Sequence, residues 1–92
     1  MNIFDMLKHY GSWTMKESRG FSAEEIAGVT SATVVPSQYG SSVCFMLKSG
    51  GSTFIPLSSN SSLGIGESVD LSKAKLVTLG KQGESDIHRV EV

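Results

Sequence analysis

Residues 29–66 read VTSATVVPSQYGSSVCFMLKSGGSTFIPLSSNSSLGIG, and this stretch decides the fold. It contains one charged side chain, Lys48, while serine, threonine and glycine alternate with short apolar runs. A solvated helix or a charged tail needs more charges than this, whereas alternating apolar and hydroxyl residues are typical of half-buried β-strands. The stretch therefore predicts closely connected strands whose polar faces are made of hydroxyl groups.

Three strands are expected within residues 29–66, and two more follow on the C-terminal side, which gives five expected strands. Pro36 ends the first strand, and Gln38-Tyr39-Gly40 turns the chain. Pro56 has no N–H to donate, so the third strand is expected at a sheet edge or with a bulge. Five short strands predict a mainly β fold, a small antiparallel barrel that is OB-like or SH3-like in size, and an open two-layer α+β arrangement is the alternative. The expected strands are 29–35, 43–48, 53–57, 74–79 and 86–92.

Two further elements are expected near the N-terminus. Ile3, Phe4, Leu7 and Tyr10 recur at helical spacing, which predicts a short helix at the start of the chain. Apolar and polar side chains alternate loosely over residues 12–20, as is typical of an edge strand.

A second short helix has the clearest local signal in the chain. Ser22 and Glu25 have the spacing of a capping box, in which each side chain accepts a hydrogen bond from the backbone N–H of the other residue. Phe21 and Ile26 have the spacing of a hydrophobic staple, and Gly28 ends the helix within about two turns. The pattern predicts a short connecting helix.

Length and composition limit the functions that are open to this chain. Its 92 residues suit a single domain, in which an N-terminal segment (1–20) and a connecting helix (21–28) precede a barrel (29–92). With a net charge of -1, the protein as a whole does not attract nucleic acid or an anionic membrane electrostatically. No signal-like or membrane-spanning run occurs, and Cys44 has no partner for an internal disulfide. We expect a cytoplasmic protein with no membrane association.

The paired glycines predict a register for the central hairpin. If Gly50 and Gly51 form a two-residue turn, Lys48 lies opposite Thr53 and Phe45 lies opposite Pro56. The side chains then fall into two sets on opposite faces. The expected interior set is Cys44, Met46, Ile55 and Leu57, and the expected outer set is Val43, Phe45, Leu47, Phe54 and Pro56.

Two interpretations of the outer set are open. Either the N-terminal helix covers it, or Phe45 and Phe54 form a platform on which the bases of single-stranded nucleic acid stack. In the second case lysines and an arginine contact phosphates, and two further rings flank the platform. The candidate nucleic-acid-binding residues are Trp13, Tyr39, Phe45, Lys48, Phe54, Lys73, Lys75, Lys81 and Arg89. The structural alternative is that the basic residues serve solubility and edge protection, while Trp13 and Tyr39 pack on the core.

The sequence lacks recognisable catalytic and metal-binding motifs. Gly64-Ile65-Gly66 has no third glycine and no long helix after it, so it is not a dinucleotide fingerprint. His9, His88 and Cys44 are too few and too dispersed for a zinc site. No serine lies in a nucleophile elbow, and no carboxylate lies in the charge-poor middle. We expect no enzymatic activity, no cofactor and no metal.

Several segments of the C-terminal two thirds resemble small OB-like proteins of phages and mobile elements. These segments are 54–57 (FIPL), 69–72 (VDLS) and 76–79 (LVTL), with Gly66 between the first two. The resemblance implies binding of single-stranded DNA or RNA, although the net charge departs from the basic character that this role favours. The alternative function is a protein-interaction or assembly module, including a homo-oligomer, that acts through the edge strand with Pro56 or through the apolar sheet face.

Overall fold

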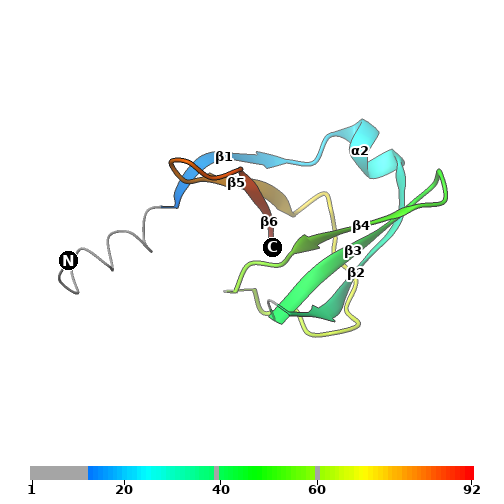
Figure 1. Ribbon diagram of the computed structural model, residues 1–92. Coiled ribbons are helices and arrows are strands. Elements are labelled where there is room, and N and C mark those ends of the chain that lie inside the picture. Colours follow the sequence, from blue (N-terminus) through cyan, green and yellow to red (C-terminus); the bar gives the residue numbers. More distant parts are fainter. Residues whose placement is uncertain (1–12, 39, 60) are drawn as a thin grey trace.

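The computed structural model describes residues 13–38, 40–59 and 61–92, and these residues form a mainly β structure. One short helix follows the first of six strands, and the two ends of the described chain lie on the same sheet (Figure 1). The elements are β1 (Thr14–Gly20), α2 (Ala23–Ala27), β2 (Val29–Ser37), β3 (Gly40–Leu47), β4 (Ser52–Pro56), β5 (Lys75–Gly80) and β6 (Ile87–Glu91).

The strands form two antiparallel sheets of three strands each, in the orders β1-β5-β6 and β2-β3-β4. The sheets meet where β4 ends beside β6, at a parallel bridge between Leu57 and Val90. There the Ser58 N–H donates to the Val90 carbonyl at 2.8 Å. The predicted mainly β fold is confirmed, whereas closure into a five-stranded barrel is not observed among the described residues. The strands divide instead into two sheets, and these contact each other only narrowly, where β4 ends beside β6.

The helix α2 has the capping predicted from the sequence. The Glu25 N–H donates to Ser22 Oγ at 3.1 Å, and the Ser22 N–H donates to Glu25 Oε1 at 2.9 Å. Arg19 on β1 donates to both carboxylate oxygens of Glu25, at 2.7 and 3.0 Å. These hydrogen bonds lower the pKa of Glu25 to about 2, first through Arg19 and then through the Ser22 backbone. The helix ends at Gly28 as expected.

The predicted strand over residues 12–20 corresponds to β1, which pairs with β5. The helix predicted at the start of the chain lies outside the described residues, and so does Tyr39. Pro56 lies on β4, which is an edge strand of its sheet, as its missing N–H predicted.

The core lies on the inner face of the β2-β3-β4 sheet. Val34, Val43 and Val90 have no exposed surface, and Phe45 is only 4% exposed. The Phe45 ring packs near that of Phe21, with a distance of 5.9 Å between the ring centroids. The buried cluster consists of Ala32, Val34, Val43, Phe45, Leu57, Val69, Leu71, Ala74 and Val90.

The predicted register of the central hairpin is wrong by three residues. Phe45 lies opposite Thr53, and Cys44 lies opposite Phe54. The Gly50 N–H donates to the Leu47 carbonyl at 3.0 Å, and Gly50 has a φ of 104°. The loop is therefore Lys48-Ser49-Gly50, a turn followed by a glycine in the left-handed region, rather than a two-residue turn made by both glycines.

An odd shift of register exchanges the faces of one strand relative to the other. Phe45 consequently faces the core with Val43 and Ile55, while Phe54 faces outward with Cys44 and is 61% exposed. The predicted interior and outer sets are thus both wrong, because each combines residues from the two faces.

Candidate binding site

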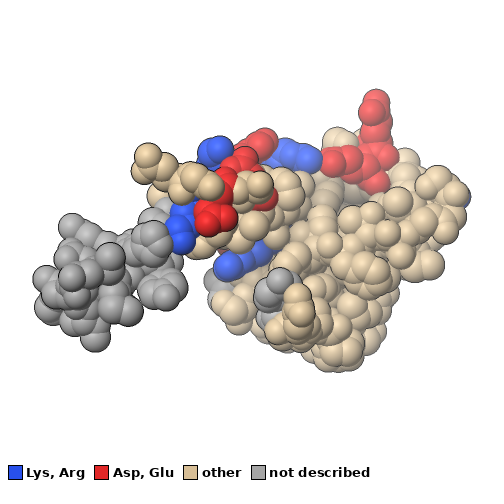
Figure 2. Space-filling view, viewed as in Figure 1, with Lys and Arg blue, Asp and Glu red and all other residues tan. Residues whose placement is uncertain are grey.

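Charged residues are distributed unequally between the two sheets. The strands β2, β3 and β4 contain none, whereas β1, β5 and β6 contain six. Figure 2 shows the same contrast on the face in view, where red and blue gather over β1, α2 and their neighbours and the β2-β3-β4 hairpins are tan. The six charged strand residues are Lys16, Glu17, Arg19, Lys75, Arg89 and Glu91.

The four edge strands of the two sheets are protected to different degrees. The free edge of β2 is covered by the segment before Asp70, because the Val34 N–H donates to the Glu67 carbonyl at 2.9 Å and the Val69 N–H donates to the Ala32 carbonyl at 2.9 Å. The edges of β1 and β6 carry charged side chains, which discourage pairing with another strand. The edge of β4 carries no charge, and between Ser52 and Pro56 no strand of the described chain pairs with it.

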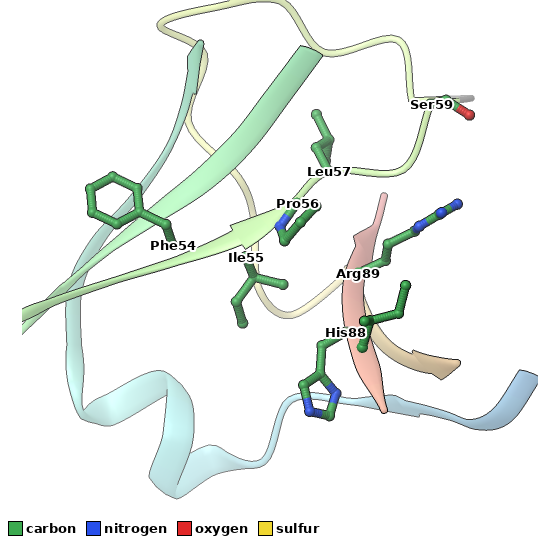
Figure 3. A pocket seen from close by; sticks show the side chains of 8 residues that line it. Phe54, Ile55, Pro56, Leu57, Ser59, His88 and Arg89 are labelled. Atoms are coloured by element: carbon green, nitrogen blue, oxygen red, sulfur yellow. The ribbon is translucent and has the colours of Figure 1, made fainter. Parts of the chain in front are cut away.

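A groove of about 520 Å³ lies between β4 and β6. Figure 3 shows Phe54, Ile55 and Pro56 on β4 at one side, and His88 and Arg89 on β6 at the other. The bridge between Leu57 and Val90 closes one end of this groove. Its volume falls within the range of about 300–1,000 Å³ that is usual for ligand sites.

The backbone of β4 presents hydrogen-bonding groups to the groove. The N–H groups of Leu47 and Leu57 donate to the carbonyls of Gly51 and Ser41, at 2.9 and 3.0 Å, at the two ends of the β3–β4 ladder. Hydrogen-bonded residues alternate along an antiparallel pair, so Thr53 and Ile55 also bond to β3. Ser52, Phe54 and Pro56 therefore face the free edge of β4, where Phe54 directs its N–H and C=O, and Pro56 its C=O, into the groove.

The free edge of β6 presents its backbone in the same way. The Val90 carbonyl already points at β4, because it accepts from Ser58. By the same alternation, His88 directs its N–H and C=O into the groove, while Ile87 and Arg89 bond to β5. Two strand edges with free backbone groups therefore face each other across the groove.

Among the described residues that line it, the groove has a cationic side chain and no acidic one. Asp and Glu are absent from its lining, whereas Arg89 is part of it. Within the described ranges Arg89 forms no salt bridge, in contrast to Lys16, which pairs with Asp86 at 3.1 Å, and Arg19. His88 Nδ1 lies 3.1 Å from Thr78 Oγ1, which holds the imidazole against β5.

The outer face of the β2-β3-β4 sheet continues the apolar character of the groove. Phe54 is 61% and Met46 is 45% exposed, and Ile87 on β6 is also exposed. Cys44 lies between Met46 and Phe54 on this face, with its Sγ 3.9 Å from Met46 Sδ. We call the surface formed by Cys44, Met46, Phe54, Pro56 and Ile87 the apolar patch.

The structure does not bring the predicted nucleic-acid-binding residues together. Phe45 is buried and Phe54 is exposed on the opposite face, so the pair forms no stacking platform. Lys81 Nζ lies 5.8 Å from the centre of the Trp13 ring, a cation–π distance; Lys81 follows the end of β5 and Trp13 precedes the start of β1. Only Phe54 and Arg89 of the described candidates line the same groove.

The remaining candidates are dispersed. Lys48 lies in the β3–β4 turn, Lys73 in the turn before β5, and Lys75 on β5. Ile87 and His88, which line the groove, were not predicted from the sequence. The approach of β4 to β6 joins segments more than thirty residues apart, for which the sequence contains no local signal.

No known protein family, curated protein or solved structure matches this chain. Among the residues that the structure describes, no helix has the length and apolar character needed to span a membrane. The same residues include no group of three or more histidine, cysteine, aspartate or glutamate side chains placed to hold a metal ion.

Proposed function

We propose that this protein is an interaction module that binds another polypeptide through β4 and the apolar patch. The observation that carries the proposal is the unequal protection of the sheet edges. A covering segment protects β2, and charged side chains protect β1 and β6, whereas β4 has neither form of protection. Exposed strand edges without charge are sites at which another chain adds a strand.

The apolar patch supports the same proposal. An exposed phenylalanine loses contact with water only if a partner covers it, and aromatic and methionine side chains are enriched in protein interfaces. Phe54 and Met46 lie side by side with Cys44 in a sheet that has no charged strand residue. A polypeptide partner therefore desolvates no charge when it covers this region of the surface.

Binding of single-stranded nucleic acid is less well supported. A backbone of phosphates requires several cations along one track, and most of the affinity depends on them. Of the described residues that line the groove, Arg89 alone is a permanent cation and Phe54 alone is an aromatic ring that could stack on a base. The prediction stays untested, and the experiment below includes it as an outcome.

A selection with displayed peptides tests the proposed function. A random peptide library is selected on the wild-type protein, and the enriched peptides are titrated against wild type, Phe54→Asp and Met15→Asp. Met15 is the matched control, because it is also highly exposed and lies on β1 of the other sheet. We expect Phe54→Asp to weaken binding by roughly tenfold or more, which corresponds to about 1.4 kcal/mol, and Met15→Asp to leave it unchanged.

Labelled single-stranded DNA and RNA are titrated in parallel at low and moderate salt. Circular dichroism confirms that both variants are folded. Failure to enrich any peptide, or peptides that bind wild type and Phe54→Asp equally, contradicts the proposed function. Oligonucleotide binding that Phe54→Asp abolishes supports the nucleic-acid function instead.

A further inference from the structure

We propose that the pocket between α2 and the β3–β4 hairpin binds one large apolar side chain of a polypeptide partner, with a lysine or arginine adjacent to that residue in the partner's sequence. We call it the α2 pocket. It is separate from the surface used in the proposed function, because it lies on the inner face of the hairpin and the apolar patch lies on the outer face. Three features carry the proposal: an apolar lining that α2 covers only in part, a small volume, and an unpaired carboxylate at the rim.

The apolar lining of the α2 pocket is an exposed end of the core. Phe45 on β3 and Leu71 in the turn before β5 line it and are buried, whereas Leu47 on β3 and Ile55 on β4 line it and are only partly buried. The helix contributes five residues to this side of the sheet, and none of them is buried. An apolar group that fills the pocket therefore completes the burial of these side chains, which is the main favourable term in association.

The volume of the pocket indicates what kind of group fills it. The pocket measures about 260 Å³. This is below the range of about 300–1,000 Å³ that is usual for sites that enclose a whole small molecule. A single leucine- or phenylalanine-sized side chain is a more suitable occupant, and side chains that anchor protein interfaces fill pockets of this kind.

The rim of the pocket has two carboxylates in different states. Arg19 donates to both oxygens of Glu25, at 2.7 and 3.0 Å, and the Ser22 N–H donates to one of them at 2.9 Å. Glu24 also lines the pocket, is exposed, and forms no salt bridge with any described residue. Of the described residues in the lining, none is a lysine or arginine. In Figure 2, red side chains stand over α2 beside the tan surface of the hairpin.

The lining and the rim together specify the chemistry of the partner. A residue whose apolar side chain enters the pocket brings its neighbour in sequence close to Glu24. A lysine or arginine at that neighbouring position can form an ion pair with the free carboxylate, whereas an acidic residue is repelled. Exposed ion pairs contribute little to affinity, so the apolar side chain supplies most of the binding and Glu24 supplies the preference for a base.

The binding test uses two blocked dipeptides, acetyl-leucyl-lysine amide and acetyl-lysyl-leucine amide, each of which has one apolar side chain beside one amine. The methyl resonances of Leu47, Ile55 and Leu71 are followed by NMR as each dipeptide is added up to millimolar concentration. We expect these resonances to shift with a millimolar or tighter dissociation constant. The methyl resonances of Ile65, which is exposed but does not line the pocket, should stay unchanged.

Two pairs of variants separate the charge from the cavity. Glu24→Gln should weaken binding of the leucyl-lysine dipeptide roughly threefold and leave binding of acetyl-leucyl-glutamine amide unchanged. Glu84→Gln is its matched control, because Glu84 is an exposed acid that does not line the pocket. Thr53→Trp places a large ring in the pocket and should abolish the shifts, whereas Ser52→Trp on the opposite face of β4 should not. Circular dichroism confirms that the variants are folded.

The possible results distinguish this site from the proposed function. If neither lysine-containing dipeptide shifts the pocket methyl groups, the site is wrong. Equal affinity for the lysine and glutamine dipeptides contradicts the basic neighbour. If light scattering shows a wild-type dimer that Thr53→Trp converts to a monomer, a second copy fills the pocket and the proposal is overturned. Peptides selected through Phe54 are tested separately, so the proposed function can stand when this site fails.

Discussion

The two sheets of this protein have the same number of strands but differ in the charge of their side chains. In the β1-β5-β6 sheet, charged side chains line the strands, and salt bridges such as Lys16–Asp86 and Arg19–Glu25 tie β1 to its surroundings. In the β2-β3-β4 sheet, the inner face contributes Ala32, Val34, Val43 and Phe45 to the core, and the strands carry no charge at all. Charged side chains therefore protect the edge strands of the first sheet, whereas the edge of β4 carries no charge and is available to a partner.

The largest expected effect tests the two faces of the uncharged sheet. Phe45→Ala should lower the free energy of unfolding by about 3–5 kcal/mol, because it leaves a cavity in the core. Phe54→Ala should change it by no more than about 0.5 kcal/mol, because the ring is exposed. Urea denaturation followed by circular dichroism measures both. Similar losses for the two variants would mean that both rings lie on one face.

The second prediction concerns the turn that sets the faces of β3 and β4. Gly50→Ala should destabilise the protein by about 1–2 kcal/mol, because alanine adopts the left-handed conformation poorly. Gly51 has no positive φ, and an added methyl group there would lie 4.0 Å from Leu47 Cδ1, an ordinary contact. Gly51→Ala should therefore have a much smaller effect in the same denaturation experiment. Equal losses would favour the two-residue turn that the paired glycines suggested.

The third prediction addresses the connection between the two sheets. Ser22→Ala removes the side chain that accepts from the Glu25 N–H at the start of α2, and should lower the free energy of unfolding by about 1 kcal/mol. Ser18→Ala is a suitable control, since this serine is exposed on β1. A thermal melt compares the two variants. If Ser22→Ala leaves the melting temperature unchanged, the capping of α2 does not stabilise the connection between the two sheets.

The smallest expected effect is the contribution of the Arg19–Glu25 ion pair to the pH dependence of the free energy of unfolding. The pKa of Glu25 is about 2 in the folded protein, below its ordinary value of 4.5, because the carboxylate accepts from Arg19 and Ser22. Its contribution to stability is thus complete above pH 4.5 and is lost as the pH falls toward 2. Glu25→Gln should flatten the stability profile over this range. An unchanged slope between about pH 5 and pH 2 in urea titrations would contradict the ion pair.

Local patterns predicted several elements of the fold well. The capping box at Ser22 and Glu25 forms as expected, because both partners lie within one turn of helix. The alternation of apolar and hydroxyl residues identified the strands of the uncharged sheet, and Pro56 marked β4 as an edge. For the candidate site, the sequence pointed to Phe54, Arg89 and the edge strand with Pro56, but it could not show that they border one groove.

Local sequence therefore identified most strand segments, the start of the short helix and the nearly uncharged stretch 29–66, because each depends on residues close together in sequence. Only the tertiary structure decided the register of the β3–β4 hairpin, since two adjacent glycines allow more than one turn and Gly50 alone adopts a positive φ there. It also decided that β4 approaches β6, because Leu57 and Val90 meet only when the shared core brings distant segments together. That meeting places two strand edges across one groove.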